Sequence, residues 1–351
     1  MNSFSFSGQI PRVIFGPGSL QYLSREIDLI GAQRALILCT PGQRAGAELV
    51  ADLIGVRCAG IFDRAVMHVP LDIAGEVRDV ALQVNADCVI AIGGGSTTGL
   101  GKAIALVSTL PILAIPTTYA GSEMTPIYGI TDNGVKKTGR DVRVLPKTVI
   151  YDPELTVDLP ASLSITSGIN AIAHAAECMY AQDANPIMSF FAEEGMRALV
   201  RGLPKIVSQL KCLEGRSDCL YGAWLCGVVL GNVGMGLHHK LCHTLGGSFR
   251  LPHAETHTII LPHVLAYNRD AAPDAMHRIS IILGAPDAAQ GMFDFAQSLA
   301  APTALKDIGM QESDLDLCAK IATQDAYPNP RSMGTKEVRA LLENAYWGNR
   351  P

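Results

Sequence analysis

The chain has 351 residues, of which 48% are hydrophobic and 17% are charged, and its formal net charge is −5. This length is more than one hydrophobic core usually holds, so we expect two domains with extensive buried surface. The acidic balance, without a long basic run, argues against nucleic acid or a membrane surface as a partner. Since no apolar stretch approaches the ~20 residues that span a bilayer, we expect a globular protein.

The sequence also favours a cytoplasmic location. The N-terminus lacks a basic segment followed by an apolar one, which is the pattern of a secretory signal. The nine cysteines include Cys39, Cys88 and Cys226 inside apolar runs, and no CxxC pair occurs. We therefore expect reduced thiols and no disulfide framework.

The first 160 residues alternate between β-rich runs and helical patterns. Apolar runs predict strands at 34–40, 60–66, 86–95, 111–118 and 147–153. Amphipathic patterns predict helices at 45–55 and 71–86, and a further helix after residue 96. Near-continuous apolar strands separated by helices are typical of a parallel sheet that is covered on both faces. We predict an α/β domain over residues 1–160.

The second part of the chain has a different character. Ala, Leu, Met and His at helical spacing dominate residues 161–351, and strand-like runs nearly vanish. This pattern predicts an all-helical second domain over 161–351. Its most apolar long stretch, residues 219–237, is predicted to be a buried core helix that leads into a group of histidines.

A glycine-rich loop, Gly-Gly-Gly-Ser at 93–96, follows one predicted strand and precedes a helix. Bare backbone N–H groups at a helix start bind anions such as a pyrophosphate, although a tight structural turn would also explain the glycines. Hydroxyl side chains follow the next predicted strand, and ligands of parallel sheets bind at such strand ends. The candidate cofactor residues in these two loops are Gly93, Gly94, Gly95, Ser96, Thr117, Thr118 and Ser122.

Four histidines form the other candidate site. His239 and His243 are four residues apart and would share one face of a helix. His253 follows a Gly-Gly pair and a Leu-Pro step, where the chain can turn back, and His174 lies upstream. Imidazole is a common metal ligand and the usual proton donor near neutral pH. The pattern predicts a metal site, an acid–base site or both, while any one of these histidines alone could be structural.

Five segments, GGGS, PTTYAGSEMTP, YDPELT, INAIAH and HHKLCHTLGG…PH, occur in this order. Together they resemble the iron-containing (group III) alcohol dehydrogenase family, which is related in fold to dehydroquinate synthase and glycerol dehydrogenase. The resemblance spans roughly residues 10–270. It implies an N-terminal dinucleotide-binding domain, a helical C-terminal domain and an active site in the cleft between them. NAD(P) would lie along the 93–96 loop with its nicotinamide facing the histidines.

The resemblance also implies a metal site, but with one departure. In that family an aspartate and three histidines usually hold a divalent metal, and the matching positions here are Asn170, His174, His239 and His253. His243 matches a histidine that is not a ligand and is implicated in proton transfer. Asparagine offers a neutral amide oxygen where a hard cation would have a carboxylate. We therefore expect no tightly bound metal at these four positions, and a divalent metal that is not required.

Two further departures lie in the nucleotide loops. Gly99 stands where family members commonly carry an aspartate, and Thr40 stands where NAD-specific members tend to carry an acidic group. With no carboxylate at that point to repel a 2′-phosphate, and with Arg44 nearby, we expect both NADH and NADPH to bind. Thr40 is therefore added to the candidate cofactor contacts.

These departures resemble one branch of the family, whose members reduce the C=C bond of maleylacetate to give 3-oxoadipate. An enolate is less basic than an alkoxide, so imidazole hydrogen bonds can stabilise it without a metal. We hypothesise that His174, His239 and His253 hold the ketone oxygen and that His243 or a neighbour protonates the α-carbon. The substrate would be a small dicarboxylate, and the basic stretch 136–143 is either a carboxylate clamp or a solvated surface loop.

Three other functions stay open at this point. The nearest is a metal-dependent (Fe or Zn) alcohol dehydrogenase acting on a small alcohol or aldehyde, against which Asn170 argues. The second is a lyase or cyclase of the dehydroquinate synthase type, and the third is a non-catalytic metal-binding protein. We expect a homodimer, the commonest closed assembly. We also expect structural roles for His257 and His263, and packing of Lys102 near the phosphate helix.

Overall fold

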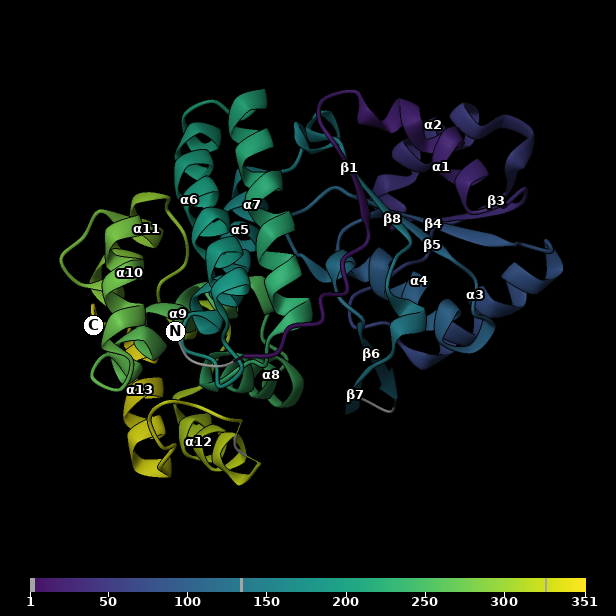
Figure 1. The fold of residues 1–351 in the computed structure, drawn as a ribbon. Helices are drawn as coiled ribbons and strands as arrows, with labels where there is room; N and C mark the ends of the chain where they lie inside the picture. The colour runs from purple at the N-terminus through teal and green to yellow at the C-terminus, as the bar shows by residue number, and fades with distance from the viewer. Residues whose placement is uncertain (1–3, 133–134, 326) are drawn as a thin grey trace. The chain divides into compact units, whose positions relative to one another are not determined.

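The computed structural model describes residues 4–132, 135–325 and 327–351 (Figure 1). Its contacts divide the chain into two units, Gln9–Leu159 and Pro160–Pro351, together with a short N-terminal segment. The first unit contains a parallel sheet with helices, and all described helices after Pro160 belong to a strand-free second unit. The predicted fold class is therefore confirmed.

The first unit is built on a six-stranded sheet in which all neighbouring strands are parallel. The strand order is β1-β8-β5-β4-β2-β3. The strands are β1 (Arg12–Phe15), β2 (Ala35–Leu38), β3 (Cys58–Phe62), β4 (Cys88–Gly93), β5 (Ile112–Pro116) and β8 (Thr148–Tyr151). The sequence predicted five of these strands and missed β1, a short edge strand with partly exposed residues.

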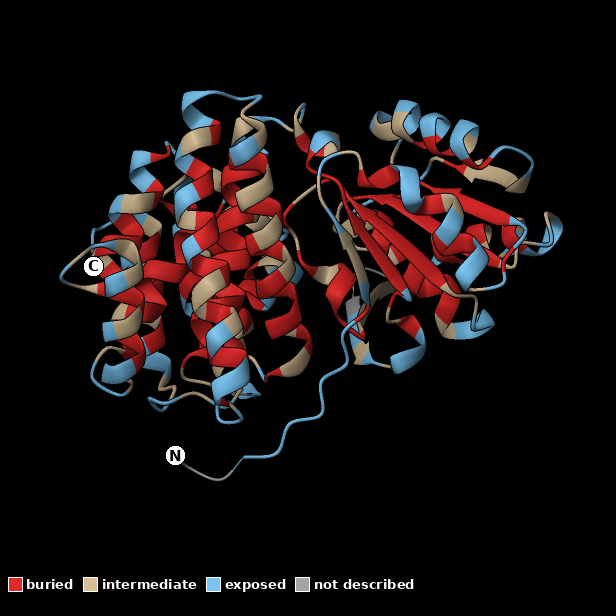
Figure 2. Ribbon diagram, turned by 45° about the horizontal axis from the view of Figure 1, so that its top comes forward, coloured by how far each residue is buried: buried red, intermediate tan, exposed pale blue. Residues whose placement is uncertain are grey.

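Helices cover both faces of this sheet (Figure 1). Successive side chains along a strand point to opposite faces, so each strand contributes to two cores. Ile37 and Ile90 pack in one core with α1 (Leu23–Leu29) and α2 (Arg44–Ile54). Leu36 and Val89 pack in another core with α3 (Leu71–Gln83) and α4 (Gly95–Ser108). Figure 2 shows the central strands as buried, which is why their sequences are almost continuously apolar.

A separate hairpin of β6 (Ile127–Asp132) and β7 (Val135–Arg140) follows β5. The sequence predicted no strand here and treated 136–143 as a basic loop, which is wrong for most of that stretch. Charged side chains conceal the alternation of a strand that is partnered on one edge only. Arg143, just beyond β7, forms an ion pair with Asp141 at 2.6 Å.

The strand order creates a switch point at the carboxyl end of the sheet. From β2 the chain moves to β3 on one side, and then returns to β4 on the other side of β2. The chain therefore leaves β2 and β4 toward opposite sides of the sheet, and nucleotides bind at such switch points in open α/β sheets. Thr40 follows β2 and the glycine loop follows β4.

The second unit consists of helices in which α5 (Ala161–Cys178) is almost entirely buried, as Figure 2 shows. The others are α6 (Pro186–Ser208), α7 (Leu213–Asn232), α8 (Leu237–Phe249), α9 (His253–Asn268), α10 (Pro273–Leu283), α11 (Ala288–Ser298), α12 (Leu315–Gln324) and α13 (Thr335–Trp347). The single helix predicted over 219–237 is wrong, since α7 ends at Asn232 and α8 begins at Leu237.

The described helices differ in length and apolarity from a membrane span. No single one is long and apolar enough to cross a bilayer, whereas α7 and α8, bent by 96° at their break, pass together by length and composition.

Candidate active site

The loop after β4 packs too closely against neighbouring side chains for residues larger than glycine at 93 and 94. Gly93 has φ 147°, and a Cβ there would lie 2.5 Å from Thr97 Oγ1. Gly94, at the N-cap of α4, has no side-chain cap, so the first N–H groups of α4 are left without that partner. A Cβ on Gly94 would lie 2.9 Å from Thr118 Oγ1, so the two glycine-rich loops lie against each other.

Hydrogen bonds join the three loops at this sheet edge. Thr117 N donates to Gly93 O at 3.0 Å. Gln43 Nε2 donates to Thr117 Oγ1 at 2.6 Å, and Thr40 Oγ1 donates to Gln43 Oε1 at 3.1 Å. The predicted residues Thr40, 93–96, Thr117 and Thr118 are thus brought together. Gln43, which links them, was not predicted, because a single glutamine has no sequence signal for such a role.

Two hydroxyls at this edge are buried and without a hydrogen-bond partner in the described residues: Thr97 Oγ1 and Ser122 Oγ. Ser122 Oγ lies 3.8 Å from the position of a Cβ on Gly95, at the start of α4. Unsatisfied buried hydroxyls beside an uncapped helix N-terminus fit a phosphate-bearing ligand. Thr97 follows the predicted Ser96 directly and would have been found by extending the loop by one residue.

Lys102 on α4 holds the loop that follows β5. Its buried ammonium donates to Ser122 O at 2.6 Å, Thr125 O at 2.8 Å and Ile127 O at 2.7 Å. Burial lowers the pKa of Lys102 to about 7, and nearby Glu123 opposes that shift. The packing predicted for Lys102 near the phosphate helix agrees with these bonds.

Arg44, expected beside the cofactor ribose, is already paired. Its guanidinium contacts Glu48 Oε1 at 2.9 Å and Asp63 Oδ2 at 3.0 Å, and all three side chains are exposed. A ligand phosphate would have to compete with these two carboxylates for Arg44.

In the helical unit, the buried Glu177 organises the start of α8. Its carboxylate accepts backbone N–H bonds from Gly236 at 2.9 Å and His238 at 2.7 Å. A Cβ on Gly236 would lie 3.0 Å from Glu177 Oε1, so a larger residue would crowd this contact. Glu177 Oε2 also lies 2.7 Å from His239 Nδ1. The sequence did not single out Glu177, whose partners lie about sixty positions further on.

The carboxylate fixes the ring of one predicted histidine, which in turn contacts a second. Because Glu177 accepts, His239 Nδ1 carries a proton, and His239 Nε2 lies 2.9 Å from His174 Nδ1. One proton is shared between those two ring nitrogens, and it can sit on either one. His174 and His239 are both buried, from α5 and α8 respectively.

Asn170 lies one helical turn before His174 on α5. Its side chain is 4% exposed, and Oδ1 has no hydrogen-bond partner in the part of the chain that is described. A buried amide oxygen without a donor favours a ligand that supplies one.

His243 lies at the exposed edge of the group. It is on α8, with its ring centroid 6.1 Å from that of His239. His243 Nδ1 lies 3.3 Å from the hydroxyl of Tyr327, whose pKa is raised by burial and by Glu177. Lys240 Nζ lies 5.5 Å from the Tyr327 ring centroid. Tyr327 was not predicted, since it is separated from His243 by 84 residues.

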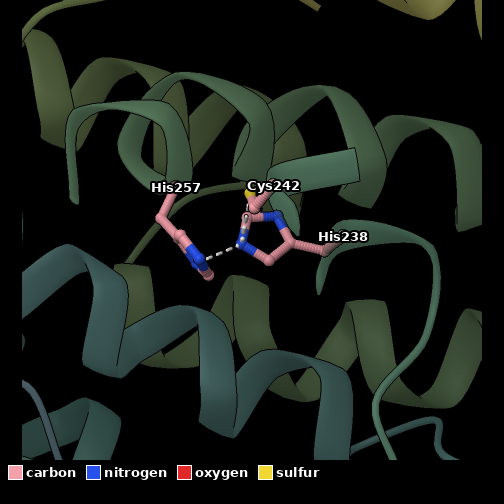
Figure 3. A group of neighbouring side chains, drawn as sticks. All are labelled: His238, Cys242 and His257. Carbon is pink, nitrogen blue, oxygen red and sulfur yellow. Dashed lines mark hydrogen bonds between the residues drawn. The ribbon is translucent and has the colours of Figure 1, made fainter. Parts of the chain in front are cut away.

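His257 on α9 connects His253 and His238 to this group. Its ring centroid lies 4.4 Å from that of His253 and 5.0 Å from that of His239. His257 Nδ1 also lies 2.9 Å from His238 Nε2 (Figure 3). His238 and His257 were not placed among the site residues, yet both contact it.

Comparison with known proteins assigns the chain to a family. The iron-containing alcohol dehydrogenase model matches residues 11–153, and the model of the C-terminal part of the Fe-containing alcohol dehydrogenase family matches residues 164–346. The chain belongs to the iron-containing alcohol dehydrogenase family. Membership implies nicotinamide-dependent oxidoreduction.

The similarity to several members of this family extends over the whole chain or nearly all of it. A maleylacetate reductase from Burkholderia cepacia is 60% identical over 351 residues, covering 100% of both chains. The crystal structure of maleylacetate reductase from Agrobacterium tumefaciens is 49% identical, with a TM-score of 0.97 and 100% of both chains covered. An iron-containing alcohol dehydrogenase structure from Corynebacterium glutamicum is 42% identical, with a TM-score of 0.94, covering 99% of this chain and 98% of that one.

The family name implies an iron site, and the matching positions here are Asn170 and three histidines. His239 Nε2, the ring nitrogen not bonded to Glu177, faces His174 Nδ1 at hydrogen-bond distance. Two ring nitrogens at this separation can share one proton, or both can turn lone pairs to one ion once that proton is lost. Asn170 adds a neutral oxygen in place of a charge. The residues present are therefore of the kind that holds a divalent metal, with one negative charge fewer than the family's usual set.

Proposed function

We propose that this chain is a maleylacetate reductase, which reduces the C=C bond of maleylacetate to give 3-oxoadipate at the expense of NADH or NADPH. Full-length similarity to maleylacetate reductases supports the reaction. The observation that carries the mechanism is the buried group of Asn170, His174, His239 and Glu177, in which two imidazoles lie beside a neutral amide at the position where the family usually has a carboxylate.

In this reaction the C=C bond conjugated to the ketone of maleylacetate is the electrophile, and hydrogen bonds to the ketone oxygen activate it. A bound nicotinamide would supply a hydride to the carbon β to the ketone. Negative charge then develops on the ketone oxygen, and the product is an enolate. His174, His239 and His253 are proposed to hold this oxygen, because preorganised donors in a buried site stabilise developing charge strongly. Glu177 fixes the His239 ring through Nδ1, and Nε2 would turn from His174 Nδ1 to the ketone oxygen when the substrate binds.

A proton must then reach the α-carbon to complete the reduction. We assign this step to His243, which is exposed and can exchange protons with solvent. When the Tyr327 hydroxyl donates to His243 Nδ1, the imidazole proton is held on Nε2, which becomes the donor atom. The balance is one hydride, one proton and one C=C bond consumed, and two C–H bonds formed.

For the cofactor, we propose contacts from Thr40, Gly93, Gly94, Gly95, Ser96, Thr117, Thr118 and Ser122. The switch point of the sheet, the uncapped α4 and the unsatisfied Thr97 and Ser122 hydroxyls support this assignment. NADH and NADPH would both serve, with release of Arg44 from Asp63 needed for a 2′-phosphate. No metal is proposed to be required at Asn170 and the three histidines.

The remaining expectations are part of the same proposal. We infer a domain division at residue 160 and a homodimer. The first unit offers nucleotide-binding loops and the second offers proton donors, so neither performs the reaction alone.

The discriminating experiment is a substrate comparison at equal enzyme concentration. Oxidation of NADH and of NADPH is followed with maleylacetate, and separately with small aldehydes. Rapid oxidation with maleylacetate and little with aldehydes supports the reductase. Preference for an aldehyde would instead identify the metal-dependent alcohol dehydrogenase alternative.

A further inference from the structure

A second group of ligating side chains lies between α8 and α9. His238 and Cys242 are four residues apart on one face of α8, and His257 projects toward them from α9 (Figure 3). One ligand atom from each of the three residues lies within 4.8 Å of the other two. The side chains are 0%, 1% and 0% exposed, respectively. None of them belongs to the four positions that match the family's metal ligands.

Hydrogen bonds within this group are poorly satisfied. His238 Nε2 has two neighbours, His257 Nδ1 at 2.9 Å and Cys242 Sγ at 3.7 Å. A neutral ring nitrogen has either one proton or one lone pair, so it cannot serve both neighbours well. The other nitrogens, His238 Nδ1 and His257 Nε2, are buried and have no partner among the residues described. An ion held between His238 Nε2, His257 Nδ1 and Cys242 Sγ would remove the competition at His238 Nε2.

Metal binding uses the lone pair of a neutral imidazole and the thiolate form of a cysteine. Burial raises the pKa of the Cys242 thiol well above its usual value, with a contribution from Glu177. An incoming ion would therefore displace one proton, that of the thiol, and leave a thiolate bound to the metal.

We propose that His238, Cys242 and His257 bind one Zn²⁺ ion through two neutral imidazoles and one thiolate. Tetrahedral zinc with Zn–N of about 2.0–2.1 Å and Zn–S of about 2.3 Å places two nitrogens about 3.3 Å apart and nitrogen and sulfur about 3.6 Å apart. The distances at His238 Nε2, 2.9 and 3.7 Å, lie near those values. The mixed nitrogen–sulfur set favours zinc over magnesium or calcium.

The ion would join α8 to α9, the helices that carry His239, His243 and His253. Its role is to fix these helices against each other, and the proposed reduction uses no step at the ion. The binding site therefore stands or falls independently of the reductase activity.

Cobalt(II) substitution of the full-length protein tests the site directly, because only a cysteine ligand gives the intense near-ultraviolet charge-transfer band of a thiolate–Co²⁺ bond. We expect the wild-type chain to bind one Co²⁺ with this band, and Zn²⁺ to displace it. Cys242→Ser should lose the band and bind Co²⁺ at least tenfold more weakly. Cys226→Ser, which alters another fully buried thiol of the same unit, should keep the band.

The melting temperature gives a second test, which remains informative if Cys242→Ser does not fold. Added Zn²⁺ should raise the melting temperature of the wild type and of Cys226→Ser, but not of His257→Gln. Co²⁺ binding without the thiolate band, or a band that survives in Cys242→Ser, would place the ion elsewhere and overturn the proposal. A zinc-independent melting temperature in the wild type would also overturn it.

Discussion

Replacing Asn170 by aspartate places a carboxylate beside the histidines that are proposed to hold the substrate oxygen. Asn170 and His174 are one turn apart on α5, and both are buried. Residues one turn apart on a helix have Cβ atoms about 5–6 Å apart, so we take about 6 Å as the separation between the new charge and an enolate oxygen bound by His174. With an effective dielectric constant of about 20, repulsion between two unit charges at this distance is about 3 kcal/mol. Asn170→Asp should therefore lower kcat/KM for maleylacetate about 100-fold in metal-free enzyme.

The same substitution restores the usual ligand type for a hard cation, so affinity for Fe²⁺ and Zn²⁺ should rise. Both quantities are measured on one preparation: initial rates of NADH oxidation after chelation, and metal content after dialysis against each ion. Asn344→Asp is the control for net charge, because Asn344 is exposed on α13. Unchanged kinetics together with unchanged metal affinity in Asn170→Asp would refute the role given to this residue.

Further substitutions test other residues of the site and one buried histidine outside it. Tyr327→Phe removes the hydroxyl beside His243 Nδ1, so kcat should fall about tenfold while the KM for NADH stays constant; an equal fall in His243→Gln and in the double variant would show a shared role. Glu177→Gln replaces the charged partner of His239, which costs about 2 kcal/mol and should lower kcat about 30-fold; full activity would contradict the shared-proton arrangement. Gly94→Ala brings a methyl group to within 2.9 Å of Thr118 Oγ1 and should raise the KM for NADH about tenfold, with turnover at saturation retained. His263 has a pKa lowered to about 4 by burial, so the unfolded chain takes up its proton first as the pH falls below 6.5. The free energy of unfolding should therefore drop by about 2 kcal/mol at this residue between pH 6.5 and pH 5, and urea unfolding of His263→Phe should show a correspondingly smaller pH dependence.

The central strands were predictable because burial on two faces leaves a signal within each strand. Ile37 and Leu38 contact different helical layers, yet both positions demand an apolar residue, and the run stands out. The hairpin of β6 and β7 lacked this signal, since it lies outside the six-stranded sheet and carries charges along β7. The break before α8 was missed because the apolar character continues through Val233 and Met235.

The candidate site divides along a similar line. Gly93 and the histidines of α8 could be found because their chemistry is concentrated in short local motifs. Glu177, Tyr327 and Gln43 act through contacts across many residues, and nothing in their own neighbourhoods marks them. Tertiary structure alone shows that one carboxylate holds both the start of α8 and the ring of His239.

The central claim is that hydrogen-bonding histidines, and no metal at Asn170 and its neighbours, stabilise the enolate. The most direct test is the initial rate of NADH oxidation with maleylacetate, measured before and after exhaustive chelation and again after adding back Fe²⁺ or Zn²⁺. The account predicts equal rates in all of these states. A rate that is lost on chelation and restored by Fe²⁺ would contradict it.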